Sequence, residues 1–294
     1  MSGTSKFSFN IGLNLSTALR ATEAFQPEGQ QIFDAEFDYS LLPTLYRGLL
    51  VPGFRKLVLV LLEKSGMGTP GMLFCRTRFI DDALTDWLRT GKQQVVCMGA
   101  GNDTRGYRIP GIEHTHYYEV DLPIPQMLKR EHMKKVLGEI PANVSYVAVD
   151  FEDQDLDLEL KKAGFRSDVQ TFFIWEGVTQ YISKEAVTAV MGFVAQAPTG
   201  SQLAFTYIKV GIIDGTSRSE VDQRIMNRVA KRGMPWLFGL EQEQLDIWLG
   251  KQGFYLIDQA GADEYRQRYL TPVGRELSIY RGERIALAGV QNVG

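Results

Sequence analysis

The chain of 294 residues is long enough for one large α/β domain or two small ones. Its 44% apolar and 23% charged residues exclude a disordered protein and provide enough material for a buried core. A net charge of −3 without a cationic block argues against nucleic acid as a partner. The two cysteines, Cys75 and Cys97, offer neither a disulfide framework nor a metal-ligand cluster, and they fit a reducing compartment.

The N-terminal residues 1–9 are polar and lack the apolar core of a signal peptide. The most apolar early run, residues 57–62, is followed by Glu63 and Lys64 and falls far short of the ~20 residues that span a bilayer. We therefore expect this run to form a buried helix. We also expect a cytoplasmic protein without a membrane partner.

The first ninety residues are predicted to be helical. Residues 16–25 form one amphipathic stretch, and residues 73–88 form another. In the second stretch the apolar positions 80, 83, 84, 87 and 88 follow the spacing of one helix face.

After residue 90 the pattern changes to strands that alternate with helices, which predicts a parallel sheet with helices on both faces. The predicted strands are residues 94–99, 115–121, 144–150, 171–176 and 202–207, and the predicted helices are 124–137, 155–163 and 184–196. The polar region 211–239 interrupts this rhythm, with a predicted helix over 218–232. This region is either a lid over a site or a surface segment without functional importance. A helix at 241–252 and strands at 255–258 and 284–288 complete the chain.

The stretch Gly99–Arg105 follows the first predicted strand directly. Glycines at the carboxyl end of a strand let the backbone approach a ligand closely, although they can also serve a turn alone. A nicotinamide-binding loop would carry a further glycine at position 104, which is threonine here. The loop therefore favours a ligand other than a dinucleotide.

Acidic residues follow at the ends of the next three strands. Glu119 and Asp121 lie on the same side of their strand and suit the two hydroxyls of a ribose, or they face solvent. Asp150 with Phe151 suits an adenine amino group and ring, or Asp150 caps a helix. Glu176 emerges from an apolar strand and suits a ligand ammonium, or it forms an internal salt bridge.

Together these strand ends resemble those of the leucine carboxyl methyltransferase family, and within it those of bacterial S-adenosylmethionine-dependent methyltransferases and polyketide-type O-methyltransferases. The resemblance runs from about Thr17 to Leu287. It is carried by residues 76–82, Gly99–Arg105, residues 118–123 with Lys129 and Arg130, residues 149–151 and residues 175–181.

The resemblance implies an α/β fold, namely the Rossmann-like seven-stranded sheet of class I methyltransferases with its last strand antiparallel. It implies one S-adenosylmethionine-dependent methyltransferase domain over residues 1–294, with a helical cap at 1–70 and a lid insertion at 208–240. The implied cofactor is S-adenosyl-L-methionine, without a metal.

The resemblance also implies a role for each site residue. Arg76 is similar to the arginine that binds the methionyl carboxylate, with a surface ion pair as the alternative. The loop under the methionyl moiety is Gly99, Ala100, Gly101 and Asp103. Asp121 is similar to the ribose ligand, with Glu119 as its substitute. Asp150 and Phe151 are similar to the adenine-binding pair, and Glu176 to the acid near the methionyl end.

Methyl transfer from a sulfonium is an in-line displacement that needs a base only when the nucleophile arrives protonated. The histidines at positions 114, 116 and 132 lie away from the fourth and fifth strand ends, so we expect them to be structural or superficial. The catalytic candidates are Glu176, Tyr181 and Tyr207. This shortage of bases favours a carboxylate acceptor, which is ionised at pH 7.

A hydroxyl acceptor remains open, and the acceptor is either a small molecule or a C-terminal carboxylate. Two other functions are also open. One is a non-catalytic S-adenosylmethionine-binding protein, and the other is a nicotinamide-dependent oxidoreductase, which the glycine spacing disfavours.

Overall fold

The structure is a computed structural model that describes residues 14–91 and 93–291. The chain forms two compact units. One comprises Met1–Asp82 with Ala260–Glu283, and the other comprises Ala83–Gln259 with Arg284–Gly294. The first unit thus extends beyond the expected cap at 1–70 and includes a segment from near the C-terminus. A single domain over 1–294 stays a prediction.

The first unit is helical, as the sequence predicts for the described part of the first ninety residues. Residues 14–20 are α-helical and lead into the short 3₁₀ helix η1. The elements that follow are η1 (Ala21–Phe25), α2 (Glu36–Leu41), α3 (Thr44–Arg47), η2 (Gly48–Leu50), α4 (Pro52–Lys64) and the first part of α5 (Thr69–Leu88), and then, after the sheet, α13 (Ala262–Tyr265), η6 (Arg266–Leu270) and η7 (Thr271–Val273).

The apolar run 57–62 is helical as predicted, but the expectation that it is buried is wrong. It lies in α4, where Leu57 and Leu61 are 51% and 57% exposed and no residue is buried. The run favours a helix by its composition, whereas its burial depends on which other element packs against it. Within residues 14–91 and 93–291, no single helix is long and apolar enough to cross a membrane, and only the bent pair of α4 and α5 together reaches that criterion.

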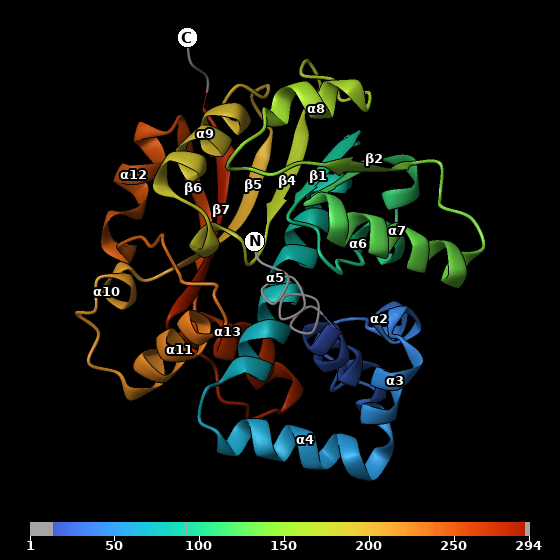
Figure 1. The fold of residues 1–294 in the computed structure, drawn as a ribbon, viewed down its shortest axis with the longest axis vertical. Coiled ribbons are helices and arrows are strands. Elements are labelled where there is room, and N and C mark those ends of the chain that lie inside the picture. The colour runs from blue at the N-terminus through green and yellow to red at the C-terminus, as the bar shows by residue number, and fades with distance from the viewer. Residues whose placement is uncertain (1–13, 92, 292–294) are drawn as a thin grey trace. The chain divides into compact units, whose positions relative to one another are not determined.

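The second unit contains a seven-stranded sheet in the order β3-β2-β1-β4-β5-β7-β6 (Figure 1). The first five strands are parallel in every pair that they form with one another. The backbone N–H of Val290, at the end of β7, donates to Ser201, just before β5 begins, so β7 runs antiparallel. The strands are β1 (Gln94–Met98), β2 (His116–Asp121), β3 (Val144–Ala148), β4 (Thr171–Trp175), β5 (Gln202–Ile208), β6 (Phe254–Ala260) and β7 (Glu283–Val290).

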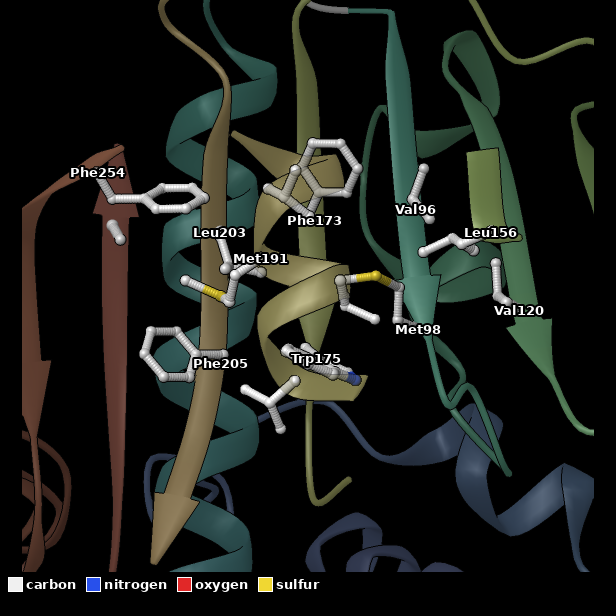
Figure 2. Close-up of a cluster of buried hydrophobic side chains, with 14 of the residues drawn as sticks. Val96, Met98, Val120, Leu156, Phe173, Trp175, Met191, Leu203, Phe205 and Phe254 are labelled. Carbon is white, nitrogen blue, oxygen red and sulfur yellow. The ribbon is translucent and has the colours of Figure 1, made fainter. Parts of the chain in front are cut away.

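Helices cover both faces of this sheet, as the alternating pattern predicts. Phe173 of β4 packs in an apolar cluster with α9 (Lys184–Val194), to which Met191 belongs (Figure 2). Phe172 points the other way and lies with its ring centroid 5.6 Å from that of Trp87, in the last turn of α5. The remaining helices of this unit are α6 (Arg105–Arg108), η3 (Ile112–His114), α7 (Pro123–Leu137), α8 (Leu156–Lys162), η4 (Thr179–Tyr181), α10 (Val210–Ile213), α11 (Glu220–Lys231), η5 (Gln242–Gln244) and α12 (Leu245–Lys251).

The predicted insertion leaves the sheet after β5 and returns beside its own starting point, where Lys209 and Leu240 form a parallel bridge. It carries α11, which matches the helix expected over 218–232 and has no buried residue. Near its end, the backbone N–H of Leu237 donates to the carbonyl of Gln180 at 2.6 Å. The insertion therefore ends beside η4, while its action as a lid stays a prediction.

Candidate functional site

The loop after β1 turns sharply at two glycines. Gly99 and Gly101 have φ values of +69° and +43°, a backbone region that side chains disfavour. A Cβ atom on Gly99 would lie 2.2 Å from Cγ2 of Val178. The backbone N–H groups of Gly99 and Ala100 both donate to the carbonyl of Val120, at 2.7 and 2.9 Å. This loop is therefore fixed against β2 and leaves no room for a side chain at position 99.

Asp121, the last residue of β2, holds the same loop. Its Oδ2 accepts the backbone N–H of Gly101 at 2.6 Å, and its Oδ1 accepts that of Leu122 at 2.7 Å. Burial raises the pKa of this carboxyl group, while the two backbone donors and Lys129 oppose the rise without cancelling it. A carboxylate offers about four lone-pair positions, so two bonds leave it able to accept from ligand hydroxyls.

Glu119 is fully buried two residues earlier, so the alternative that these two acids face solvent is wrong. Its Oε2 lies 2.7 Å from Nζ of Lys129, and neither side chain is more than 3% exposed. Burial raises the pKa of Glu119 to about 7, against the lowering effect of Lys129. The structure thus gives Glu119 an internal partner, and its substitute role as a ribose ligand stays a prediction.

Arg105, the first residue of α6, lies between two carboxylates. Its Nη1 donates to Oε2 of Glu176 at 2.7 Å and also contacts the carboxylate of Asp103. Burial raises the pKa of Asp103, but Arg105 and Lys129 lower it by more, so it lies below its usual value. The internal salt bridge that the sequence left open for Glu176 is present, while its contact with a ligand ammonium stays a prediction.

Asp150 shapes a tight turn after β3. Its carboxylate accepts the backbone N–H of Glu152 at 3.1 Å, and its carbonyl accepts that of Gln154 at 2.9 Å. The alternative that Asp150 caps a helix is wrong, because Asp155 caps α8 instead. Phe151 is half-buried with its ring edge-on to Trp175, at 6.3 Å between centroids. Their role as an adenine-binding pair stays a prediction.

The two candidate tyrosines differ in accessibility. Tyr181 is partly exposed in η4, and its backbone N–H donates to the carbonyl of Val178 at 2.9 Å. Tyr207 is fully buried in the apolar cluster, with its ring 6.0 Å from that of Phe205. The structure therefore presents Tyr181 to a ligand more readily than Tyr207.

The surroundings of His116 and His114 bear on the role expected for the histidines. His116 stacks on Tyr118 at 4.4 Å, and its Nε2 lies 3.1 Å from the hydroxyl of Ser145. His114 is 83% exposed and lies 3.4 Å from Glu113. These surroundings fit the structural or superficial roles expected for both.

Arg76 belongs to α5 in the first unit. Its Nη1 lies 2.7 Å from Oε1 of Glu283, with 11% and 6% of the two side chains exposed. Arg76 therefore has an ion-pair partner, but this pair is largely buried, so the alternative of a surface ion pair is wrong. A role for Arg76 in binding the methionyl carboxylate stays a prediction.

Two buried cations near these strand ends, Arg105 of α6 and Lys129 of α7, had no role among the residues predicted from the sequence. No spacing in the sequence marks either cation, because their carboxylate partners come from the ends of other strands. Asp103 and Glu176 contact the guanidinium of Arg105, and Glu119 contacts the ammonium of Lys129, while Asp121 holds the glycine loop nearby. These acidic side chains outnumber the two cations, which suits a positively charged ligand.

Comparisons with known proteins find related sequences and a related fold. The family model for leucine carboxyl methyltransferase matches residues 14–195. A candidate S-adenosyl-L-methionine-dependent methyltransferase of Mycobacterium marinum is 32% identical over 207 residues, which cover 66% of this chain and 68% of that protein. A similarly described protein of Bacillus subtilis is 25% identical over 207 residues, and the match covers 70% of this chain and 68% of that protein.

The crystal structure of a DUF574 family protein from Streptomyces avermitilis has a related fold. Its TM-score is 0.57 at 15% identity, and the match covers 92% of this chain and 99% of that one. At this identity the likeness concerns the fold alone.

Proposed function

Because the chain belongs to the leucine carboxyl methyltransferase family, we propose that it methylates an oxygen atom, first of all a carboxylate oxygen, of a small molecule or a peptide C-terminus. It is a methyltransferase with the fold of class I enzymes, and S-adenosylmethionine is its methyl donor. The nature of the acceptor is the part that we propose.

The residues at the strand ends fit this donor. S-adenosylmethionine supplies a methyl group on a sulfonium, and it also carries an ammonium and a carboxylate, so its net charge is positive. The surplus of buried carboxylates around Arg105 and Lys129 suits such a ligand. The missing side chain at Gly99 lets the loop turn close against Val178, whose Cγ2 would lie only 2.2 Å from a Cβ atom there.

The role of each residue in the proposed reaction is binding and alignment. Asp121 would accept from the ribose hydroxyls and Asp150 from the adenine amino group. Glu176 would meet the ammonium. In-line displacement at a methyl group needs chiefly this alignment, because a neutral thioether leaves readily.

The observation that carries the choice of acceptor is the ion pair between Arg105 and Glu176. A carboxylate already paired with a guanidinium is a weak base, so Glu176 is poorly suited to remove a proton from an acceptor. Tyr207 is buried among apolar side chains. An acceptor that arrives ionised at neutral pH needs no base, and a carboxylate is such an acceptor.

The test is a transfer assay with S-adenosylmethionine labelled in its methyl group. Carboxylic acids, phenols and a peptide with a free C-terminus are compared as acceptors. We expect label in products that release methanol on mild base treatment, as methyl esters do and aryl methyl ethers do not. Label that appears only in base-stable products would contradict the carboxylate assignment. Donor binding without any release of S-adenosylhomocysteine would instead indicate a non-catalytic binding protein.

A further inference from the structure

Arg105 joins two segments that are far apart in sequence. It follows the glycine loop after β1, and Glu176 follows β4, 71 residues later. The side chain of Arg105 is 3% exposed, and that of Glu176 is 13% exposed. Such a buried cation requires charged partners, and both of its carboxylate partners lie at the carboxyl ends of neighbouring strands.

The partner on the glycine loop, Asp103, is fixed from several sides. Its Oδ1 accepts the backbone N–H of Arg105 at 2.7 Å and the hydroxyl of Tyr117 at 3.2 Å. Its own N–H donates to the carbonyl of Ala100, and its carbonyl accepts from Nζ of Lys129, each at 2.7 Å. These four hydrogen bonds hold Asp103 in place beside the guanidinium.

The second partner of Arg105 lies directly after β4, and its side chain is 13% exposed. Glu176 is the first residue after the strand, and the next residue, Gly177, donates its N–H to the hydroxyl of Thr206 at 2.7 Å. Arg105 with its two carboxylates carries a net charge of −1 when all three are ionised. One ammonium group would neutralise the trio.

We propose that Arg105 is a positioning residue for the donor. Anchored on Asp103, its guanidinium holds the carboxylate of Glu176 in one place, ionised, to receive the α-ammonium of the donor. The planar guanidinium can bond two carboxylates at once in a fixed geometry, which a lysine ammonium reproduces poorly. This inference rests on the proposed function, and within it on the contact between Glu176 and the ammonium.

The test measures binding of two ligands by calorimetry. S-adenosylhomocysteine carries the amino acid tail, and 5′-methylthioadenosine has the same nucleoside without it. We expect Arg105→Met to weaken the binding of S-adenosylhomocysteine by about tenfold, which is within the range of interaction energies between neighbouring residues. The affinity for 5′-methylthioadenosine should stay within about twofold of that of the parent. Arg105→Lys should give a smaller loss of the same kind.

Arg108→Met is the matched control, because it removes the same charge from the same short helix. Nε of Arg108 donates to the hydroxyl of Thr104 at 2.9 Å, so the contact that this variant removes differs from those of Arg105. We expect the affinity of this variant for both ligands to equal that of the parent. Equal losses for both ligands in Arg105→Met would mean that Arg105 merely supports the fold, which would overturn the proposal.

A double-mutant cycle with Glu176→Gln shows whether Arg105 acts through Glu176. If it does, Arg105→Met weakens S-adenosylhomocysteine far less in the Glu176→Gln background than in the parent. The same tenfold loss in both backgrounds, or no effect of Glu176→Gln, overturns the proposal. Should Arg105→Met not fold, Arg105→Lys and Asp103→Asn take its place in the cycle. If the parent itself binds neither ligand, the proposed function fails instead.

Discussion

Gly101 donates its backbone N–H to the carboxylate of Asp121 at 2.6 Å, so the end of β2 holds the loop that follows β1. The same carboxylate accepts the N–H of Leu122. Asp121 therefore has a structural task in addition to its predicted bond to the ribose. Its replacement should affect both the affinity for the donor and the stability of the protein.

We predict that Asp121→Ala weakens the binding of the donor by about 1.5–3 kcal/mol for each hydrogen bond to the carboxylate that is lost. The free energy of unfolding should fall too, by about 1–3 kcal/mol, because a buried N–H loses its acceptor. Calorimetry with S-adenosylhomocysteine and urea unfolding measure the two effects. Asp155→Ala is the control, since losing the cap of α8 lowers stability without touching the site. Parental affinity in a folded Asp121→Ala protein would refute the ribose assignment.

Position 99 gives a prediction about shape. Gly99→Ala places a Cβ atom 2.2 Å from Cγ2 of Val178 at a φ of +69°. It should destabilise the protein by more than the roughly 1–2 kcal/mol of left-handed strain alone. Gly91→Ala isolates that strain, because Gly91 has a φ of +74° and open space around it. Adding Val178→Ala to the Gly99→Ala variant should restore part of the lost free energy of unfolding. If urea unfolding shows Gly99→Ala to be as mild as Gly91→Ala, the close approach is absent.

The predicted role of Arg76 follows from the family resemblance and not from general features of α/β sheets. Variants at this position therefore test the resemblance itself. If the guanidinium of Arg76 binds the methionyl carboxylate, Arg76→Lys should weaken S-adenosylmethionine clearly and leave 5′-methylthioadenosine almost unchanged. Glu283→Gln breaks the same ion pair but keeps the guanidinium, so donor affinity should survive in it. Equal effects of both variants on S-adenosylmethionine would show that only the ion pair matters.

Much of the fold can be predicted from the sequence because its signals are local. The apolar runs of β1 and β4 are short and bounded by polar residues, which favours buried strands. The helix at 57–62 shows the limit of such signals, because its exposure depends on what the rest of the fold places against it. The segment between β6 and β7 forms short helical turns over 262–273 that lack a long period, and the sequence did not predict them.

The sequence predicts which residues lie at the candidate site better than it predicts which partners those residues contact. Strand alternation puts Glu119 and Asp121 on one side, and both prove to be buried. Their partners cannot be read from spacing, because Lys129 comes from α7 and Gly101 from the preceding loop. The bond between Arg105 and Glu176 joins two strand ends that only the sheet order brings together.

We expect Glu119 to make the stability of the protein depend on pH. Because burial raises its pKa from 4.5 to about 7, the folded protein binds this proton more tightly than the unfolded chain does. Its contribution to stability is therefore complete below about pH 4.5 and is lost as the pH rises through 7. We predict that the free energy of unfolding of the parent, relative to Glu119→Gln, falls between pH 5 and 7.5. The same difference at both pH values, measured by urea unfolding, would mean that Glu119 does not titrate there.

The central claim is that the carboxyl ends of β1 to β4 bind the methyl donor. Calorimetric titration with S-adenosylhomocysteine tests it most directly. We predict a micromolar Kd, and at a ligand concentration a hundredfold above it we predict an increase of about 2.7 kcal/mol in the free energy of unfolding. A titration that gives no heat, together with no thermal shift from either S-adenosylhomocysteine or S-adenosylmethionine, would contradict the claim.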